Sequence, residues 1–284
     1  MPSEPVPISV VVTVRNEESH LRALLDSLIV QEPPFEILIV DGGSRDGTLR
    51  VAREFERAHP GVVRAWLYPS SRGEGRNHGV ARARHDRIAF TDGDCVADPG
   101  WLAAIRRGFL EAPVVAGTTV PIAPSRFGEL ERVELYLEGS DVTFPSANLG
   151  YAAALFRELG GFDPRFVTAE DIDLNLRAVQ AGARILHVPE AIIRHRPRES
   201  WPAFLRQAFW NGYGRKQLTE KHGAMWGHYR VERLAHGQRG AVAMVRLGAA
   251  LTGYFARVLT GRRDRIAYEG PVRPGATGAP PKAG

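Results

Sequence analysis

Two aspartates, Asp92 and Asp94, stand one residue apart at the end of a short apolar segment, residues 87–91. That segment has the composition of a buried strand, so both carboxylates leave its end in a loop. An ionised carboxylate is costly to bury alone, whereas Mg²⁺ is typically held by one or two carboxylates together with water and phosphate oxygens. The spacing therefore favours a divalent cation site, although an Asp-Gly pair is also common in plain surface turns.

The elements ahead of this motif predict how it is positioned. Strands are expected over residues 8–14, 35–40, 62–67 and 87–91, and helices after Asn16, which can cap the first of them, and over 48–58 and 73–83. This alternation predicts a doubly wound, mainly parallel sheet flanked by helices. Ligands of such sheets bind beyond the carboxyl ends of the strands, so residues 14–16, 41–44 and 92–94 are expected to meet.

Beyond residue 98 the pattern is less regular. Helices are expected over 101–110, 168–181 and 201–214, strands over 114–120, 148–154 and 185–188, and an amphipathic segment over 129–138. Residues 239–261 are apolar, with Arg239, Arg246 and Arg257 on one helical face. The pattern is equally compatible with a helix at a membrane interface and with a helix packed on the domain or on a second subunit.

Composition narrows the class of partner. The chain has 284 residues, a net charge of +5 and an isoelectric point of about 9.6, which suits an anionic ligand or an acidic lipid surface. Cys95 is the single cysteine, so an intrachain disulfide is excluded and a reducing, cytoplasmic setting fits. The N-terminal residues lack the basic region of a signal peptide. A nucleic-acid partner is disfavoured because no basic run is interleaved with aromatic residues.

Several side chains near the expected strand ends could hold a nucleotide. Asp41 follows the second strand, where its carboxylate can accept from a base or a ribose hydroxyl, or simply cap a turn. Gly73 and Arg76 open the third helix, an arrangement that suits phosphate oxygens but also a solvated basic face. Glu17 lies in the first turn of its helix, where the helix dipole alone favours an acid.

The ordered set of these motifs resembles glycosyltransferase family 2. The resemblance rests on residues 14–18, 40–48, 75–79, 92–94, 160–163, 170–174 and His195, and covers roughly residues 8–215. It implies the GT-A fold, with a catalytic domain over 1–200 that has a nucleotide-binding half over 1–98 and an acceptor half over 99–200. A helical extension over 201–268 and a disordered tail over 269–284 are expected to follow.

The resemblance also implies a reaction. A single sugar would move, with inversion, from a nucleotide-diphospho-sugar (UDP- or GDP-sugar) to an acceptor hydroxyl, such as that of a lipid-linked or cell-envelope glycan precursor. Gln207-Ala208-Phe209-Trp210 departs from the Gln-x-x-Arg-Trp motif of processive members, which favours single transfer. The location would be cytoplasmic, with peripheral contact to the inner membrane face or a homodimer through the C-terminal helices.

The family roles map onto individual residues. Asp171 would be the general base, unless it only closes a capping box with Thr168. Asp94 and His195 would hold Mg²⁺ or Mn²⁺, unless His195 is a plain surface histidine in a basic loop. The expected donor-binding residues are Val14, Glu17, Asp41, Gly43, Ser44, Gly73, Arg76, Asp92 and Gly93, and the expected acceptor-binding residues are Asn148 and Glu170.

Two other functions remain open. A nucleotidyltransferase that forms sugar nucleotides would need a glycine-rich basic loop after the first strand, which residues 13–17 do not provide. A non-catalytic relative would bind nucleotide without transfer, and the presence of Asp41, Asp94 and Asp171 argues against it.

Overall fold

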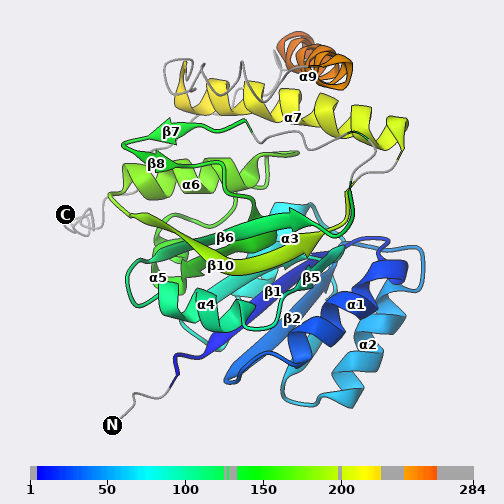
Figure 1. Ribbon diagram of the computed structural model, residues 1–284, viewed down its shortest axis with the longest axis vertical. Coiled ribbons are helices and arrows are strands. Elements are labelled where there is room, and N and C mark those ends of the chain that lie inside the picture. Colours follow the sequence, from blue (N-terminus) through cyan, green and yellow to red (C-terminus); the bar gives the residue numbers. More distant parts are fainter. Residues whose placement is uncertain (1–4, 125–126, 128–132, 198–199, 225–239, 261–284) are drawn as a thin grey trace, which may run out of the picture.

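The computed structural model describes residues 5–124, 127, 133–197, 200–224 and 240–260. Its centre is a curled, mainly parallel sheet of eight strands in the order β3-β2-β1-β4-β9-β6-β10-β5 (Figure 1). The eight strands are β1 (Ile8–Val14), β2 (Phe35–Asp41), β3 (Val63–Leu67), β4 (Arg87–Asp92), β5 (Cys95–Ala97), β6 (Val114–Pro121), β9 (Leu149–Ala152) and β10 (Ile185–His195). Strands β5 and β9 run antiparallel to their neighbours. The predicted fold class is thereby confirmed.

Helices cover both faces of this sheet. The α-helices of the described residues are α1 (Glu18–Ile29), α2 (Thr48–Ala58), α3 (Arg72–Val80), α4 (Trp101–Gly108), α5 (Ala153–Glu158), α6 (Glu170–Gln180), α7 (Trp201–His222) and α9 (Ala241–Thr260), of which α1 to α6 pack on the sheet. The alternate residues of β1 explain why the first strand has almost no polar break. Val10 and Val12 pack in one core with α1, α2 and α4, while Val11 packs in a second core with α3, α5 and α6.

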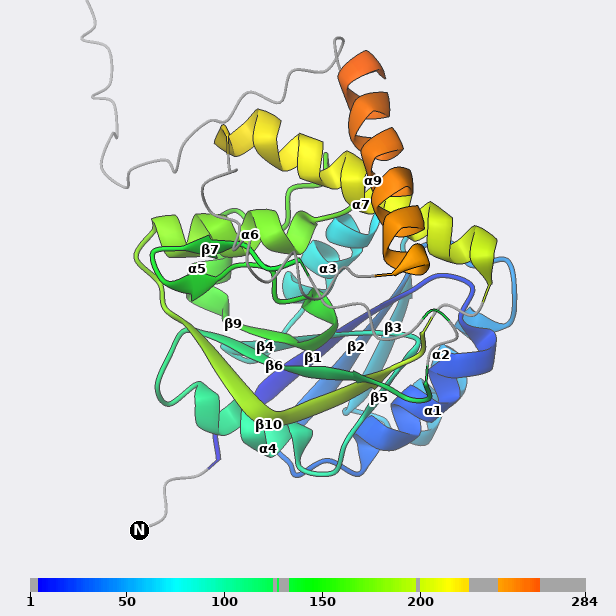
Figure 2. The ribbon, with the colours of Figure 1, turned by 45° about the horizontal axis from the view of Figure 1, so that its top comes forward.

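Helix α7 forms a further layer over α6 (Figures 1 and 2). Its Leu218 packs with Ile172 and Leu176 of α6 in a third apolar cluster, which also includes Val142. Val142 directly follows the strand β8 (Ser140–Asp141), which pairs with β7 (Tyr136–Leu137). Lys221 of α7 contributes an ionic clamp. Its Nζ lies 2.8 Å from both Asp163 Oδ2 and Asp173 Oδ1, and it is almost fully buried. These contacts fix α7 above the carboxyl-end edge of the sheet.

Helix α9 crosses α7 at close range (Figure 2). Gly212 of α7 lies against the backbone of Ala250, and Gly253 of α9 lies against the backbone of Phe209, so closely that a β-carbon at either glycine would overlap carbonyl oxygen. By length and composition α9 is the one helix among the described residues that could cross a membrane. It lies at one end of the molecule, farthest from the sheet (Figure 1).

Several expected elements need correction. Residue 148 ends a short 3₁₀ helix, Ser146–Asn148, β9 follows as Leu149–Ala152, and α5 begins at Ala153, so the strand expected over 148–154 is shorter. Residues 129–132 of the expected amphipathic segment lie outside the described residues, and Tyr136–Leu137 is a strand. Asn16 does not cap α1, because its φ is +56° and its Oδ1 instead accepts from the N–H of Arg45.

Candidate active site

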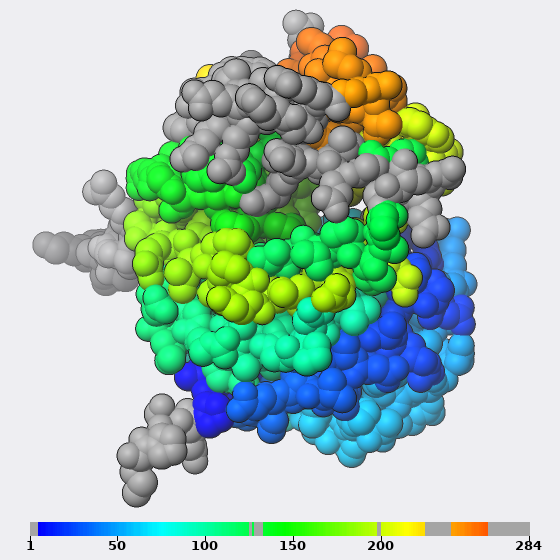
Figure 3. Space-filling model, in the orientation of Figure 1, coloured from blue at the N-terminus to red at the C-terminus, as the bar shows by residue number. Residues whose placement is uncertain are grey.

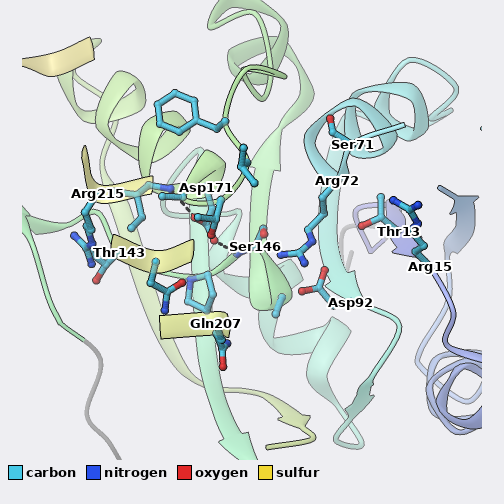
Figure 4. Close-up of a pocket in the computed structure, with 18 of the residues that line it drawn as sticks. Thr13, Arg15, Ser71, Arg72, Asp92, Thr143, Ser146, Asp171, Gln207 and Arg215 are labelled. Carbon is cyan, nitrogen blue, oxygen red and sulfur yellow. Dashed lines mark hydrogen bonds between the residues drawn. The ribbon is translucent and has the colours of Figure 1, made fainter. Parts of the chain in front are cut away.

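A cavity of about 1000 Å³ lies beyond the carboxyl ends of β1, β2 and β4 and beneath α6, α7 and α9. Val14, Gly42 and Asp94 line it from three strand ends that the sequence predicts to meet. Figure 4 shows the Asp92 and Asp171 side chains reaching this cavity, Asp92 from the end of β4 and Asp171 from the start of α6. The structure thus brings carboxylates from the two halves of the chain to one space.

Asp41 divides its two carboxylate oxygens between two tasks. Its Oδ1 accepts from the backbone N–H groups of Gly43 and Ser44, at 2.9 and 2.7 Å, and Gly43 holds the turn at a φ of +94°. Its Oδ2 is buried and has no hydrogen-bond partner among the described residues. Such an oxygen costs free energy until a donor reaches it. Asp41 therefore caps the turn, and it lies fully buried behind the cavity wall, between Val40 and Gly42, which line the cavity.

Ser44 and Glu17, two further residues of the expected donor site, lie in the neighbouring loops. Ser44 Oγ accepts from the backbone N–H of Asn16, which joins the loop after β2 to the loop after β1. Glu17 lines the cavity and lies 2.8 Å from His20 Nδ1. Gly93 lies against both Val14 and Glu17, since a β-carbon there would come within 2.7 Å of a Val14 methyl group. Any side chain at position 93 would therefore push this floor apart.

Arg76 is fully buried, which corrects the expectation that it contacts a diphosphate. Its Nη2 donates to Asp92 Oδ1 and its Nη1 to Glu170 Oε1, each at 2.7 Å. Glu170 is also buried, and its pairing with Arg76 corrects the expectation that it binds the acceptor. Arg76 thus joins the end of β4 to the start of α6 and orients both carboxylates.

Asn148 likewise has a structural role instead of the expected contact with an acceptor. It is fully buried, accepts from Trp101 Nε1 at 2.8 Å and donates to the carbonyl oxygens of Thr118 and Ala191. Gly73 is buried against Phe162 rather than exposed to the cavity. The sequence pattern cannot distinguish these residues from ligand contacts, because their partners lie on distant segments.

Arg72 is the cation that the start of α3 presents to the cavity (Figure 4). It is exposed, one helical turn before the buried Arg76. The N-terminus of α3 itself is already occupied by a capping box between Ser71 and Glu74. Arg72 is therefore better placed than the helix N-terminus to meet an anionic group.

Further arginines that the sequence analysis left without a site role also line this cavity. Arg15, Arg72, Arg215 and Arg246 stand against four acidic side chains, Glu17, Asp92, Asp94 and Asp171. They come from four different elements, so only the fold brings them together. The four arginines and four acids leave the lining nearly neutral, so a bound divalent cation would make its net charge positive, which favours binding of a diphosphate.

Asp94 and His195 form the candidate metal site. Asp94 Oδ2 lies 3.2 Å from His195 Nε2, because the antiparallel pairing of β5 with β10 places His195 beside the end of the Asp-Gly-Asp loop. Both line the cavity, and no cluster of three or more metal-ligating side chains occurs within the described ranges. One carboxylate and one imidazole fit Mn²⁺ or Mg²⁺ only if phosphate oxygens and water complete the shell, as both ions allow.

Cys95 is not part of this metal site. Its thiol is buried, and burial, followed by the nearby charges of Asp92 and Asp94, raises its pKa well above the usual range. A thiol that stays protonated is neither a good ligand nor a nucleophile. Cys95 therefore packs in the core beside the acidic loop, as its small size predicts.

Asp171 has the properties of a base. The residue before α6, Ala169, has a φ of +65°, and no side chain caps the helix, so the capping-box alternative with Thr168 is wrong. Asp171 Oδ2 instead accepts from the backbone N–H of Ser146 at 3.1 Å. Burial and then the charge of Glu170 raise the pKa of Asp171 to about 6, against the opposing effect of that N–H. At neutral pH it is an ionised carboxylate of increased basicity.

Comparisons with known proteins agree with this geometry. The sequence profile of the family described as "Glycosyltransferase like family 2" matches residues 5–214. The pre-mycofactocin glycosyltransferase of Mycobacterium tuberculosis is 32% identical over 225 residues, which are 72% of this chain and 46% of that relative. The chain therefore spans about half the length of that curated relative.

Two solved structures share the fold. The mannosyltransferase PcManGT from Pyrobaculum calidifontis, in complex with GDP-Man and Mn²⁺, is 18% identical, with a TM-score of 0.62 over 92% of this chain and 77% of that one. S. aureus TarS 1–349 in complex with UDP is 21% identical, with a TM-score of 0.53 over 72% of this chain and 64% of that one. At these identities the likeness establishes the GT-A architecture.

Proposed function

The chain belongs to glycosyltransferase family 2, and on this premise we propose that it moves one sugar from a nucleotide-diphospho-sugar to an acceptor hydroxyl. The observation that carries the proposal is the shared cavity: Asp94 and Asp171, from the two halves of the chain, both line it. The acceptor is a hydroxyl of a lipid-linked or envelope glycan precursor, and the reaction takes place on the cytoplasmic side.

The donor is a UDP- or GDP-sugar held along the ends of β1, β2 and β4. Asp41 Oδ2, which is buried behind the cavity-lining Gly42 and has no partner within the described part of the chain, accepts from the base or the ribose once a donor reaches it. Asp92 stands beside the sugar-proximal end. Arg72 meets the diphosphate, since it is an exposed cation that the start of α3 presents to the cavity. The structural relatives that hold UDP and GDP-Man support a nucleotide-sugar donor of this kind.

The Asp41→Asn variant tests this donor site. Asparagine keeps an oxygen for the N–H groups of Gly43 and Ser44 but places an N–H₂ group where Asp41 Oδ2 lies. We expect the dissociation constant for UDP or GDP to rise roughly 10–100-fold, while the melting temperature without ligand changes little. Calorimetric titration measures the affinity, and unchanged binding of both nucleotides would remove Asp41 from the donor site.

In the proposed reaction Asp171 removes the proton from the acceptor hydroxyl as its oxygen attacks the anomeric carbon. Attack on the side opposite the leaving diphosphate inverts that centre. Arg72 then balances the charge that builds on the diphosphate, and Asp94 with His195 would hold Mg²⁺ or Mn²⁺ beside it. The cation, when bound, supplies further electrophilic stabilisation of the leaving group.

A thermal-shift screen tests the proposed function as a whole. UDP, GDP and their sugar conjugates are each added with Mn²⁺, with Mg²⁺ or with a chelator. One nucleotide at a large excess over its dissociation constant should stabilise the chain by about 3–4 kcal/mol, and more with the cation than without it. No stabilisation by any nucleotide would contradict the proposal.

The Asp94→Asn variant separates the cation from the nucleotide. We expect it to abolish the extra stabilisation given by Mn²⁺ while leaving part of the nucleotide effect, because Asp94 is the carboxylate nearest His195. The exposed Asp86, outside the cavity, provides the matched control Asp86→Asn. If Mn²⁺ stabilises the Asp94→Asn nucleotide complex as strongly as the parent, the metal site lies elsewhere.

A further inference from the structure

Helix α9 differs from an ordinary surface helix, because it buries the charged Arg257 against the protein and exposes apolar side chains to solvent. Arg257 points inward, where its Nε donates to Glu220 Oε2 at 3.0 Å and its guanidinium stacks over Tyr213. The side turned away from α7 carries no charged residue. Its large exposed side chains, called here the outer face of α9, are Met244, Val245, Leu247, Leu251, Phe255, Val258 and Leu259.

This orientation is fixed by the crossing with α7. At Gly212 and Gly253 the two helix backbones touch, so α9 cannot rotate about its own axis without overlap. The ion pair of Arg257 with Glu220 of α7 helps to hold α9 in the same orientation about its axis. Helix α9 lies at one end of the molecule (Figure 3), and its apolar outer face is held exposed there.

The outer face continues into the cavity that holds Asp171. Leu251 is exposed among the outer-face residues and also lines that cavity, together with Arg246 and Tyr254 of α9. A molecule with an apolar tail along α9 and a polar head in the cavity would thus follow one continuous surface. Its polar head would enter the cavity that Asp171 lines.

We propose that the outer face of α9 rests on an anionic lipid membrane and that this membrane presents an amphiphilic acceptor to the cavity. This inference rests on the proposed function, because it assigns the acceptor class of the same site. An apolar helix face buries its side chains at the lipid boundary, and positive charge strengthens attraction to anionic lipid. The chain has a net charge of +5, and its sequence places Arg262, Arg263 and Arg265 directly after α9.

A second copy of the chain covers this face less well. A helix of 20 residues is about 30 Å long and 10 Å wide, so two such faces would bury roughly 300–500 Å² on each partner. A stable interface needs about 800 Å² on each partner. The close crossing with α7 also holds α9 against the protein, which favours contact at the membrane surface over a separate spanning helix.

Co-flotation with vesicles tests the proposal on the full chain. The probes are vesicles of phosphatidylcholine with phosphatidylglycerol, and vesicles of phosphatidylcholine alone. The test variant is Met244→Gln/Leu247→Gln/Phe255→Gln/Leu259→Gln, which leaves the cavity lining unchanged. The matched control is Val30→Gln/Leu110→Gln, which removes two of the most exposed apolar side chains distant from α9.

The parent and the control should bind the anionic vesicles equally and the neutral vesicles more weakly. The four-residue variant should lose roughly a hundredfold in partition coefficient while keeping its nucleotide-induced thermal shift. Equal vesicle binding by all three proteins would overturn the proposal. So would a parent dimer without vesicle binding that the variant dissociates, or a parent chain that alkaline carbonate fails to extract from membranes.

The two proposals fail separately in these assays. Vesicle binding through α9 without any nucleotide-induced shift would leave the membrane contact intact and contradict the sugar transfer. A nucleotide-induced shift without vesicle binding would leave the sugar transfer intact and contradict the membrane contact. Transfer to a detergent-solubilised long-chain alcohol or lipid phosphate, but not to a short water-soluble analogue, would confirm the acceptor class.

Discussion

Replacing Asp171 with asparagine is expected to lower kcat by about 10²–10⁴-fold, the usual contribution of a general base. Asparagine keeps the shape of the side chain and can still accept from the backbone N–H of Ser146. Binding of the nucleotide should therefore persist while transfer is lost. Initial rates with saturating donor and acceptor measure the effect, and the matched Asp86→Asn variant should retain the parent rate.

The pH dependence of the parent gives an independent check on Asp171. Because burial raises its pKa to about 6, kcat/KM should fall as the pH drops through about 6, where the carboxylate takes up a proton. The unfolded chain has the ordinary pKa of 3.8, so the free energy cost of ionising Asp171 in the fold grows as the pH rises from about 4 and is complete above about pH 6. Asp171→Asn should accordingly melt no lower than the parent at pH 8. If Asp171→Asn keeps nearly the parent turnover and the parent melting temperature, another group is the base.

Replacing Arg76 with methionine is expected to cost about 3–5 kcal/mol of unfolding free energy, because it leaves two carboxylates, Asp92 and Glu170, without their buried cation. Urea denaturation measures this loss. Turnover should fall as well, since Asp92 and the start of α6 lose their shared anchor. The double variant Arg76→Met/Glu170→Gln removes one of the stranded charges and should recover part of the stability.

Arg72 offers the matched control, since it lies one helical turn earlier and is exposed to the cavity. Arg72→Met should change stability by less than about 1 kcal/mol but weaken the binding of nucleotide diphosphates. The two arginines thus separate a fold-stabilising role from a ligand-binding role on one helix. If Arg76→Met unfolds at the same urea concentration as Arg72→Met, the buried ionic bridge is not needed for stability.

The strands were predictable because both faces of the sheet are buried. Residues 8–14 form β1 with the predicted bounds, and β2 and β4 each end one residue later than expected. A run of β-branched residues with no polar alternation is sufficient to predict a strand where both faces of the sheet are covered by helices. The ends of β9 and α3 were less accurate, because they depend on contacts with other segments.

The site was predictable only where local sequence determines geometry. Asp41 with its glycine turn, and the Asp-Gly-Asp loop, lie where the pattern places them. Arg72 and Arg76 look alike in sequence, and a partner 94 residues away decides which one is buried. Asp173 and Arg177 have the spacing of an ordinary surface pair, yet Asp173 is fully buried beside Lys221. Long-range pairing of this kind leaves no local signal.

The tight contact of Gly93 with Val14 and Glu17 bears on attempts to redirect this protein to other sugars. Most substitutions at position 93 would distort the cavity floor itself, whatever substrate is offered. Libraries are better directed to Gln207, which lines the same cavity, is exposed and has no assigned role in binding or catalysis. The smallest residue of the acidic loop is thereby its least replaceable position.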